Sequence, residues 1–203
     1  MKIKDITGII EQAAPLWMQE SYDNSGLIVG HPDGDVSSAL LCVDITEAVM
    51  DEAEELGVDM VISHHPVIFH PLKRLTGTTY VQRVVERAIR AGIALYACHT
   101  NLDAVQGGLS YKLAEQLGIG ELKLLSPSRP EDPTVGFGVI GKVAEPVRTE
   151  DFMRRMMDRL DLSVVRHSAI CKPPVPTVAP CPGSGASLIE PVPLYPYDPA
   201  HVL

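Results

Sequence analysis

Histidines and a carboxylate follow two predicted strands at the points where those strands end. His64 and His65 come directly after one apolar run, and His99 and Asp103 come directly after the next. Imidazole nitrogens and carboxylate oxygens are the ligands that Zn²⁺, Mn²⁺ and Fe²⁺ accept in proteins. His64, His65 and Asp103 are therefore candidate metal ligands. His99 is either a further ligand or the candidate catalytic residue, as a proton carrier.

The adjacency of His64 and His65 is the strongest local feature. Neighbouring side chains of an extended segment point to opposite sides, and Pro66 favours an extended conformation at His65. We therefore expect the two imidazoles to serve two different metal ions. The ordinary alternative is one histidine in the core and the others in surface loops. The combination with Asp103 favours a metal site over that alternative.

Strands and helices alternate from residue 1 to about 125. The periodicity predicts strands over 26–29, 39–43, 58–62 and 93–97, and helices over 5–18, 46–56, 79–91 and 109–117. Near-continuous apolar strands linked by helices indicate an α/β fold with a mostly parallel sheet flanked by helices. Ligands gather at the carboxyl ends of such strands, so we expect the two polar clusters to meet in space.

A proline-rich stretch over 126–134 is a candidate domain boundary. It separates a metal-binding α/β domain, 1–125, from a second, incomplete α/β region, 126–203. In that region we predict a strand over 134–143, a helix over 149–160 and a further strand over 162–166. Nine of the 17 prolines lie in the last 33 residues, which predicts an irregular tail.

Three glycine-containing segments could be mistaken for ligand loops. Gly136–Gly141 matches the G-x-G-x-x-G pattern, but no helix begins within it, so we reject a dinucleotide loop. Residues 182–189 form either a turn or an anion-binding loop, and the turn is favoured. Asp23–Gly26 is interpreted first as a polar turn, with a place at the mouth of a site as the second interpretation.

Composition restricts the class of protein. With 17 Lys and Arg against 26 Asp and Glu, the net charge is −9, and no basic patch suits a nucleic-acid backbone. No run approaches the roughly 20 apolar residues of a membrane span. Cys42 and Cys98 lie in apolar segments where a free cysteine acts as a small hydrophobe. We expect a cytoplasmic protein that binds neither nucleic acid nor membrane.

Four segments resemble the Nif-three-like dinuclear metal-centre proteins, also named GTP cyclohydrolase I type 2 homologues. The segments are Ser21–Gly30, Asp59–Pro66, His99–Ala104 and Gly183–Ile189. The resemblance implies an α/β protein that assembles into a toroidal homohexamer with two divalent metal ions (Zn, Mn or Fe) per subunit. It also implies that His64 and Asp103 bind one metal and His65 the second, with His99 close by.

The sequence departs from that family at its end. Family members carry a G-H-x-x-x-E block whose His and Glu are further ligands, and this sequence has no such block. Compared with the family, the sequence thus has a truncated or divergent C-terminus, and the number of bound ions is left open between the family's two and fewer. The leading hypothesis is a metal-dependent hydrolase acting on a small-molecule substrate such as a nucleotide. The alternatives are a non-catalytic metal-binding or protein-interaction module and a poorly folding product.

Overall fold

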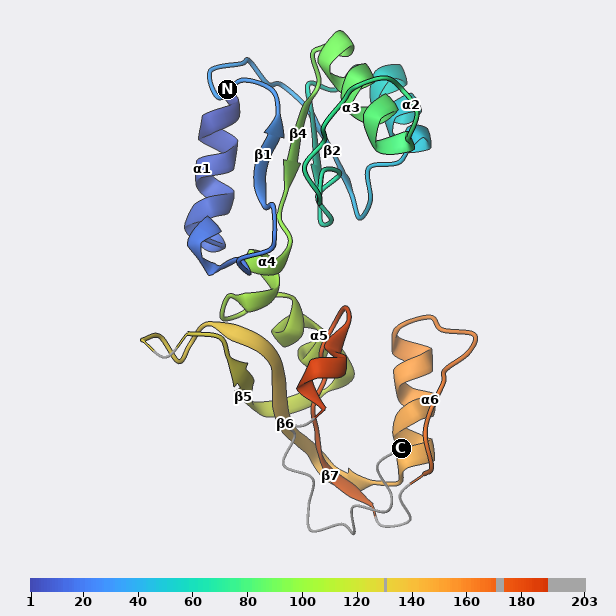
Figure 1. The fold of residues 1–203 in the computed structure, drawn as a ribbon. Helices are drawn as coiled ribbons and strands as arrows, with labels where there is room; N and C mark the ends of the chain where they lie inside the picture. Colours follow the sequence, from blue (N-terminus) through green and yellow to red (C-terminus); the bar gives the residue numbers. More distant parts are fainter. Residues whose placement is uncertain (130, 171–173, 190–203) are drawn as a thin grey trace. The chain divides into compact units, whose positions relative to one another are not determined.

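Alternating strands and helices fold into two units, Met1–Val105 and Gln106–Leu203 (Figure 1). The computed structural model describes residues 1–203 except 130, 171–173 and 190–203. Among the described residues, no helix combines the length and the apolar character that crossing a membrane requires.

A four-stranded sheet forms the centre of the first unit. The elements in chain order are α1 (Ile3–Ala13), the short 3-10 helix η1 (Leu16–Met18), β1 (Gly26–Val29), β2 (Ala39–Cys42), α2 (Glu47–Leu56), β3 (Met60–Ser63), α3 (Tyr80–Ala91), β4 (Ala94–Ala97) and α4 (Thr100–Ala104). The strand order is β1-β4-β3-β2. β1 is antiparallel to β4, and the other two pairs are parallel. The predicted α/β fold with a mostly parallel sheet is confirmed.

Both faces of the central strands are buried. Neighbouring residues of a strand point to opposite faces, and each face belongs to a different core. Val61 of β3 and Leu95 of β4 belong to a core shared with α2 and α3. Met60 and Tyr96 belong to a second core, which α1 covers from the other side (Figure 1). β2 is an edge strand, and its Leu41 is 72% exposed. The continuous apolar pattern thus corresponds to two-sided burial in β3 and β4 only.

Local signals set the ends of the helices that separate the parallel strands. The side chain of Thr46 accepts a hydrogen bond from the backbone of Val49 at the start of α2, as an N-cap residue does. Gly57 ends α2 with φ of 63°, in the left-handed region that favours glycine. α3 begins after Thr79 and ends at Gly92 in the same way. The predicted bounds of both helices are close to those observed.

A three-stranded antiparallel sheet, in the order β5-β6-β7, organises the second unit. The elements are α5 (Leu109–Leu117), β5 (Ile119–Pro127), β6 (Gly136–Val147), α6 (Thr149–Arg159), β7 (Val175–Val178) and the 3-10 helix η2 (Gly185–Leu188). Residues from α5, β5, β6 and α6 share one buried cluster that includes Leu117, Val139 and Phe152. The strand predicted over 134–143 and the helix predicted over 149–160 are present, with shifted ends.

Other predictions for this unit differ from the structure. The boundary expected near residue 125 falls inside β5, and the units divide between Val105 and Gln106. The proline-rich stretch after β5 connects two antiparallel neighbours, so it joins strands rather than domains. Residues 162–166 form no strand, and Val164 is 74% exposed. The described part of the tail contains β7, where Pro176 lies in an edge strand that tolerates a missing N–H.

The G-x-G-x-x-G segment has a structural explanation. Gly136 and Gly141 both lie in β6. A Cβ at Gly136 would lie 2.1 Å from the carbonyl oxygen of Ser126, and one at Gly141 would lie 2.4 Å from that of Gly120. These two glycines therefore permit close approach of β5 to β6, and the rejection of a dinucleotide loop is consistent with this strand.

Candidate metal centre

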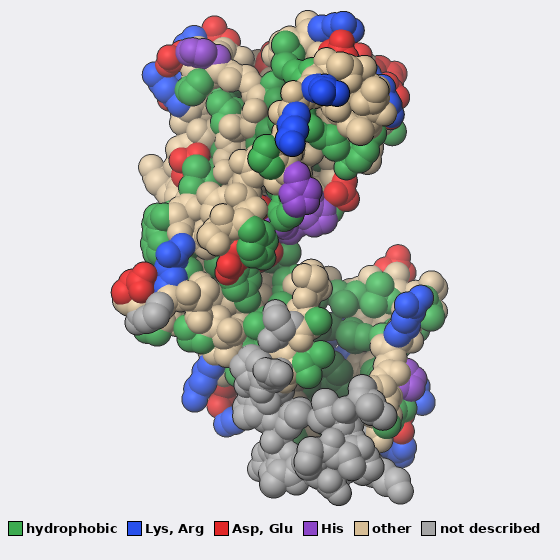
Figure 2. All heavy atoms as spheres, in the orientation of Figure 1, with side chains coloured by type: hydrophobic (Ala, Val, Ile, Leu, Met, Phe, Trp, Pro, Cys, Tyr) green, Lys and Arg blue, Asp and Glu red, His purple; other side chains and the backbone are tan. Residues whose placement is uncertain are grey.

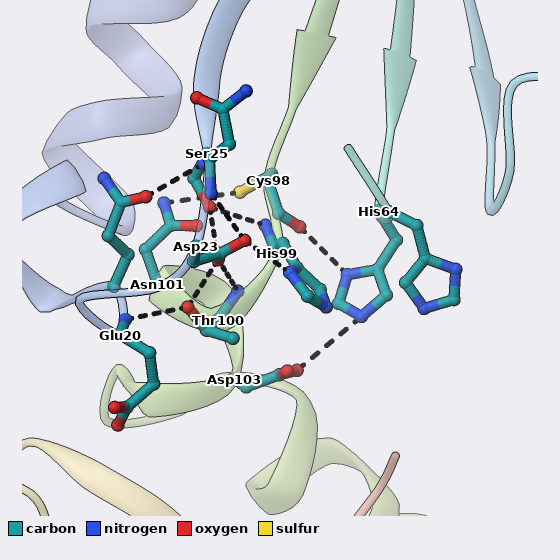
Figure 3. A network of polar contacts seen from close by, with 12 residues as sticks. Glu20, Asp23, Ser25, His64, Cys98, His99, Thr100, Asn101 and Asp103 are labelled. Atoms are coloured by element: carbon teal, nitrogen blue, oxygen red, sulfur yellow. Dashed lines mark hydrogen bonds and ion pairs between the residues drawn. The ribbon is translucent and has the colours of Figure 1, made fainter. Parts of the chain in front are cut away.

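The register of β3 and β4 brings the two predicted clusters together. The strands are parallel neighbours, and Ser63 pairs with Ala97 at their carboxyl ends. The next residues, His64 and Cys98, therefore lie beside each other. Nδ1 of His64 lies 2.9 Å from the carbonyl oxygen of Cys98 (Figure 3). The expectation that the strand ends meet in space is confirmed.

The imidazoles of His64 and His65 converge rather than point apart. Their ring centroids are 4.9 Å from each other, and both lie within 5.4 Å of the centroid of His99. The expectation of opposite directions is wrong because β3 ends at Ser63 and the chain bends there. The Ser63 hydroxyl donates to the carbonyl oxygen of His65 at 2.8 Å and supports this bend. The three histidines form one cluster.

Each imidazole of the cluster has its Nδ1 engaged. His64 Nδ1 faces the Cys98 carbonyl oxygen, His65 Nδ1 lies 2.8 Å from an Asp44 carboxylate oxygen, and His99 Nδ1 lies 2.8 Å from one of Asp23. Carbonyl and ionised carboxylate oxygens only accept, so Nδ1 carries the proton in each ring. The Nε2 of each neutral ring then keeps a lone pair, which is the arrangement found in histidines that bind metal.

Asp103 of α4 places a buried carboxylate oxygen beside the histidine cluster. Its Oδ1 is buried and has no hydrogen-bond partner among the described residues. It lies 3.8 Å from Nε2 of His64 (Figure 3), a distance too long for a hydrogen bond. A lone pair and a carboxylate oxygen that face each other are stabilised by a positive ion between them. The donor set therefore fits a divalent metal ion.

Asp23 belongs to the site, although from the sequence it was interpreted first as a turn residue. Its side chain is fully buried and accepts hydrogen bonds from His99 Nδ1, the Thr100 backbone and hydroxyl, the Ser25 hydroxyl and the Asn24 backbone. Burial alone would raise the pKa of Asp23, but these hydrogen bonds hold it well below its usual range. The second interpretation of Asp23–Gly26, a place at the mouth of a site, was the one signal in the sequence for this role.

The cluster combines partial burial with an opening to solvent. The side chains of His64, His99 and Asp103 are each about one-fifth exposed, whereas that of His65 is 48% exposed. Histidine side chains reach the surface at the lower end of the first sheet in this view (Figure 2). A small molecule therefore has access to the cluster from solvent.

Local electrostatics sharpen the roles of the remaining groups. The hydrogen bond to Asp23 raises the pKa of His99 against the opposing effect of burial. Burial also raises the pKa of Asp103, opposed by the nearby imidazoles of His64 and His99. Burial raises the pKa of the Cys98 thiol to about 11, which disfavours the thiolate form that binds metal.

One nitrogen of each of His64, His65 and His99 lies within 4.8 Å of the nitrogens of the other two, a spacing that suits a shared metal ion. The cluster thus comprises all three predicted histidines, and Asp103 borders it through His64. The division into ligands and a catalytic proton carrier stays a prediction. The geometry places His99 among the candidate ligands.

Comparison with known proteins identifies the family. The family model Duf34/NIF3 (NGG1p interacting factor 3) matches residues 1–193. The chain belongs to the Duf34/NIF3 family. The predicted family membership is therefore confirmed, over every residue that the structure describes.

Relatives with names and structures support the same assignment. A GTP cyclohydrolase 1 type 2 homolog of Clostridium perfringens is 32% identical over 185 residues, which cover 91% of this chain and 70% of that protein. A protein of the same name from Lactococcus lactis is 35% identical and covers 93% of this chain and 72% of its own length. A Staphylococcus aureus hypothetical protein of known structure has a TM-score of 0.84 at 28% identity, covering 92% of this chain and 73% of that one.

Proposed function

We propose that this Duf34/NIF3 protein is a divalent-metal-dependent hydrolase that acts on a nucleotide or a related heterocycle. The observation that carries the proposal is the cluster of three imidazoles, each with Nδ1 engaged, beside the unpartnered carboxylate oxygen of Asp103. The nucleotide as substrate class is supported by the names of the relatives, GTP cyclohydrolase 1 type 2 homologs.

The residues of the site have two proposed roles, metal binding and proton transfer. His64, His65 and Asp103 would hold the metal, one or two ions per chain, and their donor types suit Zn²⁺, Mn²⁺ or Fe²⁺. A divalent ion held there supplies a water acidic enough to lose its proton near pH 7. His99, oriented by Asp23 at 2.8 Å, either completes the ligand set or carries that proton to the leaving group.

Turnover by the metal-loaded chain tests the proposal. Protein loaded in turn with Zn²⁺, Mn²⁺ and Fe²⁺ is incubated with GTP and with simple phosphoesters, beside His64→Ala and an exposed control, His31→Ala. We expect turnover in the wild type and in His31→Ala, and loss in His64→Ala. The hydrolase proposal is refuted if wild-type turnover is no higher than that of His64→Ala with every metal and substrate. Metal retention without turnover would favour the alternative, a non-catalytic metal-binding module.

His99→Ala separates the two roles of that residue. Loss of turnover with bound metal unchanged assigns His99 to proton transfer, and loss of metal assigns it to the ligand set. Elemental analysis of the same sample as the turnover assay gives both readings.

We also propose, from the family resemblance, that the chain forms a homo-oligomer, in the first instance a toroidal hexamer, and acts in the cytoplasm. Light scattering coupled to size-exclusion chromatography tests the assembly. A monomer at micromolar concentration would contradict it.

A further inference from the structure

Two aromatic side chains stand at the edge of the histidine cluster. Tyr22 is 64% exposed and Phe69 is 39% exposed, so both rings offer apolar surface to solvent. The centroid of Phe69 lies 6.2 Å from that of Tyr22 and 6.2 Å from that of His99. An aromatic surface thus continues directly from a candidate metal-binding imidazole towards solvent.

The contacts leave ring surface for a ligand. The interplanar angle is 63° between Phe69 and Tyr22 and 78° between Phe69 and His99. A third edge contact joins Phe69 to His70, with centroids 5.1 Å apart. Phe69 stays 39% exposed despite these three contacts, so part of its ring surface is open to solvent. A flat ligand ring that packs on this exposed surface would have its polar end towards His99, whose ring contacts Phe69.

The two loops that carry the aromatic rings are tied together. The side-chain amide of Asn24 donates to the carbonyl oxygen of Ile68 at 2.7 Å. Asn24 lies two residues after Tyr22, and Ile68 directly precedes Phe69. The neighbouring Asp23 fixes the same loop to His99. This fixed arrangement lowers the ordering cost of binding, as a pre-organised site does.

We propose that Tyr22 and Phe69 form a binding surface for the planar ring of a heteroaromatic ligand whose polar end reaches the histidine cluster; this rests on the proposed function, in which the cluster holds the metal ion. Planar bases stack on aromatic side chains with little dependence on base identity. A protein partner would need about 800 Å² of contact on this side, far more than two rings offer. The expected ligand is therefore a small molecule.

Matched ligands isolate the contribution of the ring. Calorimetric titrations of GMP and of ribose 5-phosphate, which lacks the base, are made on the wild-type chain with and without Mn²⁺. The ratio of the two dissociation constants measures the preference for the base. The variants are Phe69→Leu, which keeps an apolar side chain without a ring, and Phe69→Tyr, which keeps the ring. Tyr80→Leu is the control, because Tyr80 is an exposed tyrosine at the start of α3.

We expect GMP to bind the wild type more tightly than ribose 5-phosphate. Phe69→Leu should lower that preference about tenfold, since stacking on one aromatic side chain is worth about that factor. Phe69→Tyr and Tyr80→Leu should leave it within about twofold. Absence of GMP binding, equal binding of the two ligands, or a preference unchanged in Phe69→Leu overturns the inference.

Metal content, measured on the same samples, separates this inference from the proposed function. Normal Mn²⁺ uptake with no base preference refutes the aromatic surface alone. A wild-type chain that takes up no Mn²⁺ contradicts the proposed function instead, and the preference measured without metal then decides the aromatic surface by itself.

Discussion

Replacing Asp23 by asparagine should weaken metal binding although it replaces no candidate ligand. Oδ1 of Asp23 accepts from the backbone of Asn24 and from Nδ1 of His99, and Oδ2 accepts from Ser25 and twice from Thr100. The amide NH₂ that Asp23→Asn introduces would therefore face hydrogen-bond donors in either orientation.

The orientation that satisfies His99 damages the site most directly. An NH₂ in place of Oδ1 donates to Nδ1 of His99, which moves the imidazole proton to Nε2 and removes the lone pair needed for a metal. The opposite orientation places NH₂ against the Thr100 backbone N–H, which then has no acceptor. We expect metal affinity to fall by a factor on the order of 10–100, the range seen for such supporting partners.

Stability should fall as well, because the Asp23 side chain is fully buried. Removing a buried charged acceptor from its donors costs about 3 kcal/mol in the free energy of unfolding. Asp33→Asn makes the same charge change at an exposed carboxylate paired with Lys4, where the effect on stability should be much smaller because solvent screens the pair.

Competition with a chromophoric chelator measures the metal affinity of the three proteins, and urea unfolding measures their stability. Asp23→Asn that binds metal as tightly as Asp33→Asn would refute the reasoning. Retained stability with lost affinity would limit the role of Asp23 to orienting His99.

Three further outcomes follow from the same structure. Thr46→Ala removes the N-cap of α2 and should cost about 1 kcal/mol in urea unfolding. Gly141→Ala should destabilise the second unit by about 2 kcal/mol or more, because its Cβ would lie 2.4 Å from a carbonyl oxygen, whereas Gly120→Ala meets nothing within 4 Å and serves as its control in the same denaturation experiment. Mn²⁺ at about 100 times its dissociation constant should stabilise the wild type by about 2.7 kcal/mol. In a thermal melt, a chelator should reverse the resulting rise in melting temperature, and His64→Ala should abolish that rise.

The features predictable from the sequence are those with local causes or simple topological ones. The N-cap and the terminal glycine of α2 fix its ends, so Thr46 and Gly57 were sufficient to place it. The meeting of His64 with the residues after β4 follows from parallel strands whose carboxyl ends share one edge. The order and spacing of these segments also predicted the family.

Long-range contacts explain the features that sequence reasoning missed. Asp23 is a turn residue locally, and only its bond to His99, 76 positions away, makes it a support of the site. The convergence of His64 and His65 depends on β3 ending at Ser63. Hydrophobic periodicity does not locate the end of a strand to a single residue. Residues 162–166 include the β-branched Val164 and Val165 but pair with no strand among the described residues. β7 pairs despite Pro176 because it lies at an edge.

Bound metal per chain, measured by elemental analysis of untagged protein, tests the central claim most directly. The wild type is compared with His64→Ala, Asp103→Ala and the exposed control His31→Ala, all purified without chelator. We predict at least one divalent ion in the wild type and in His31→Ala, and a marked loss in both site variants. A metal-free wild type after incubation with Zn²⁺, Mn²⁺ and Fe²⁺, or equal metal in all four proteins, would contradict the claim.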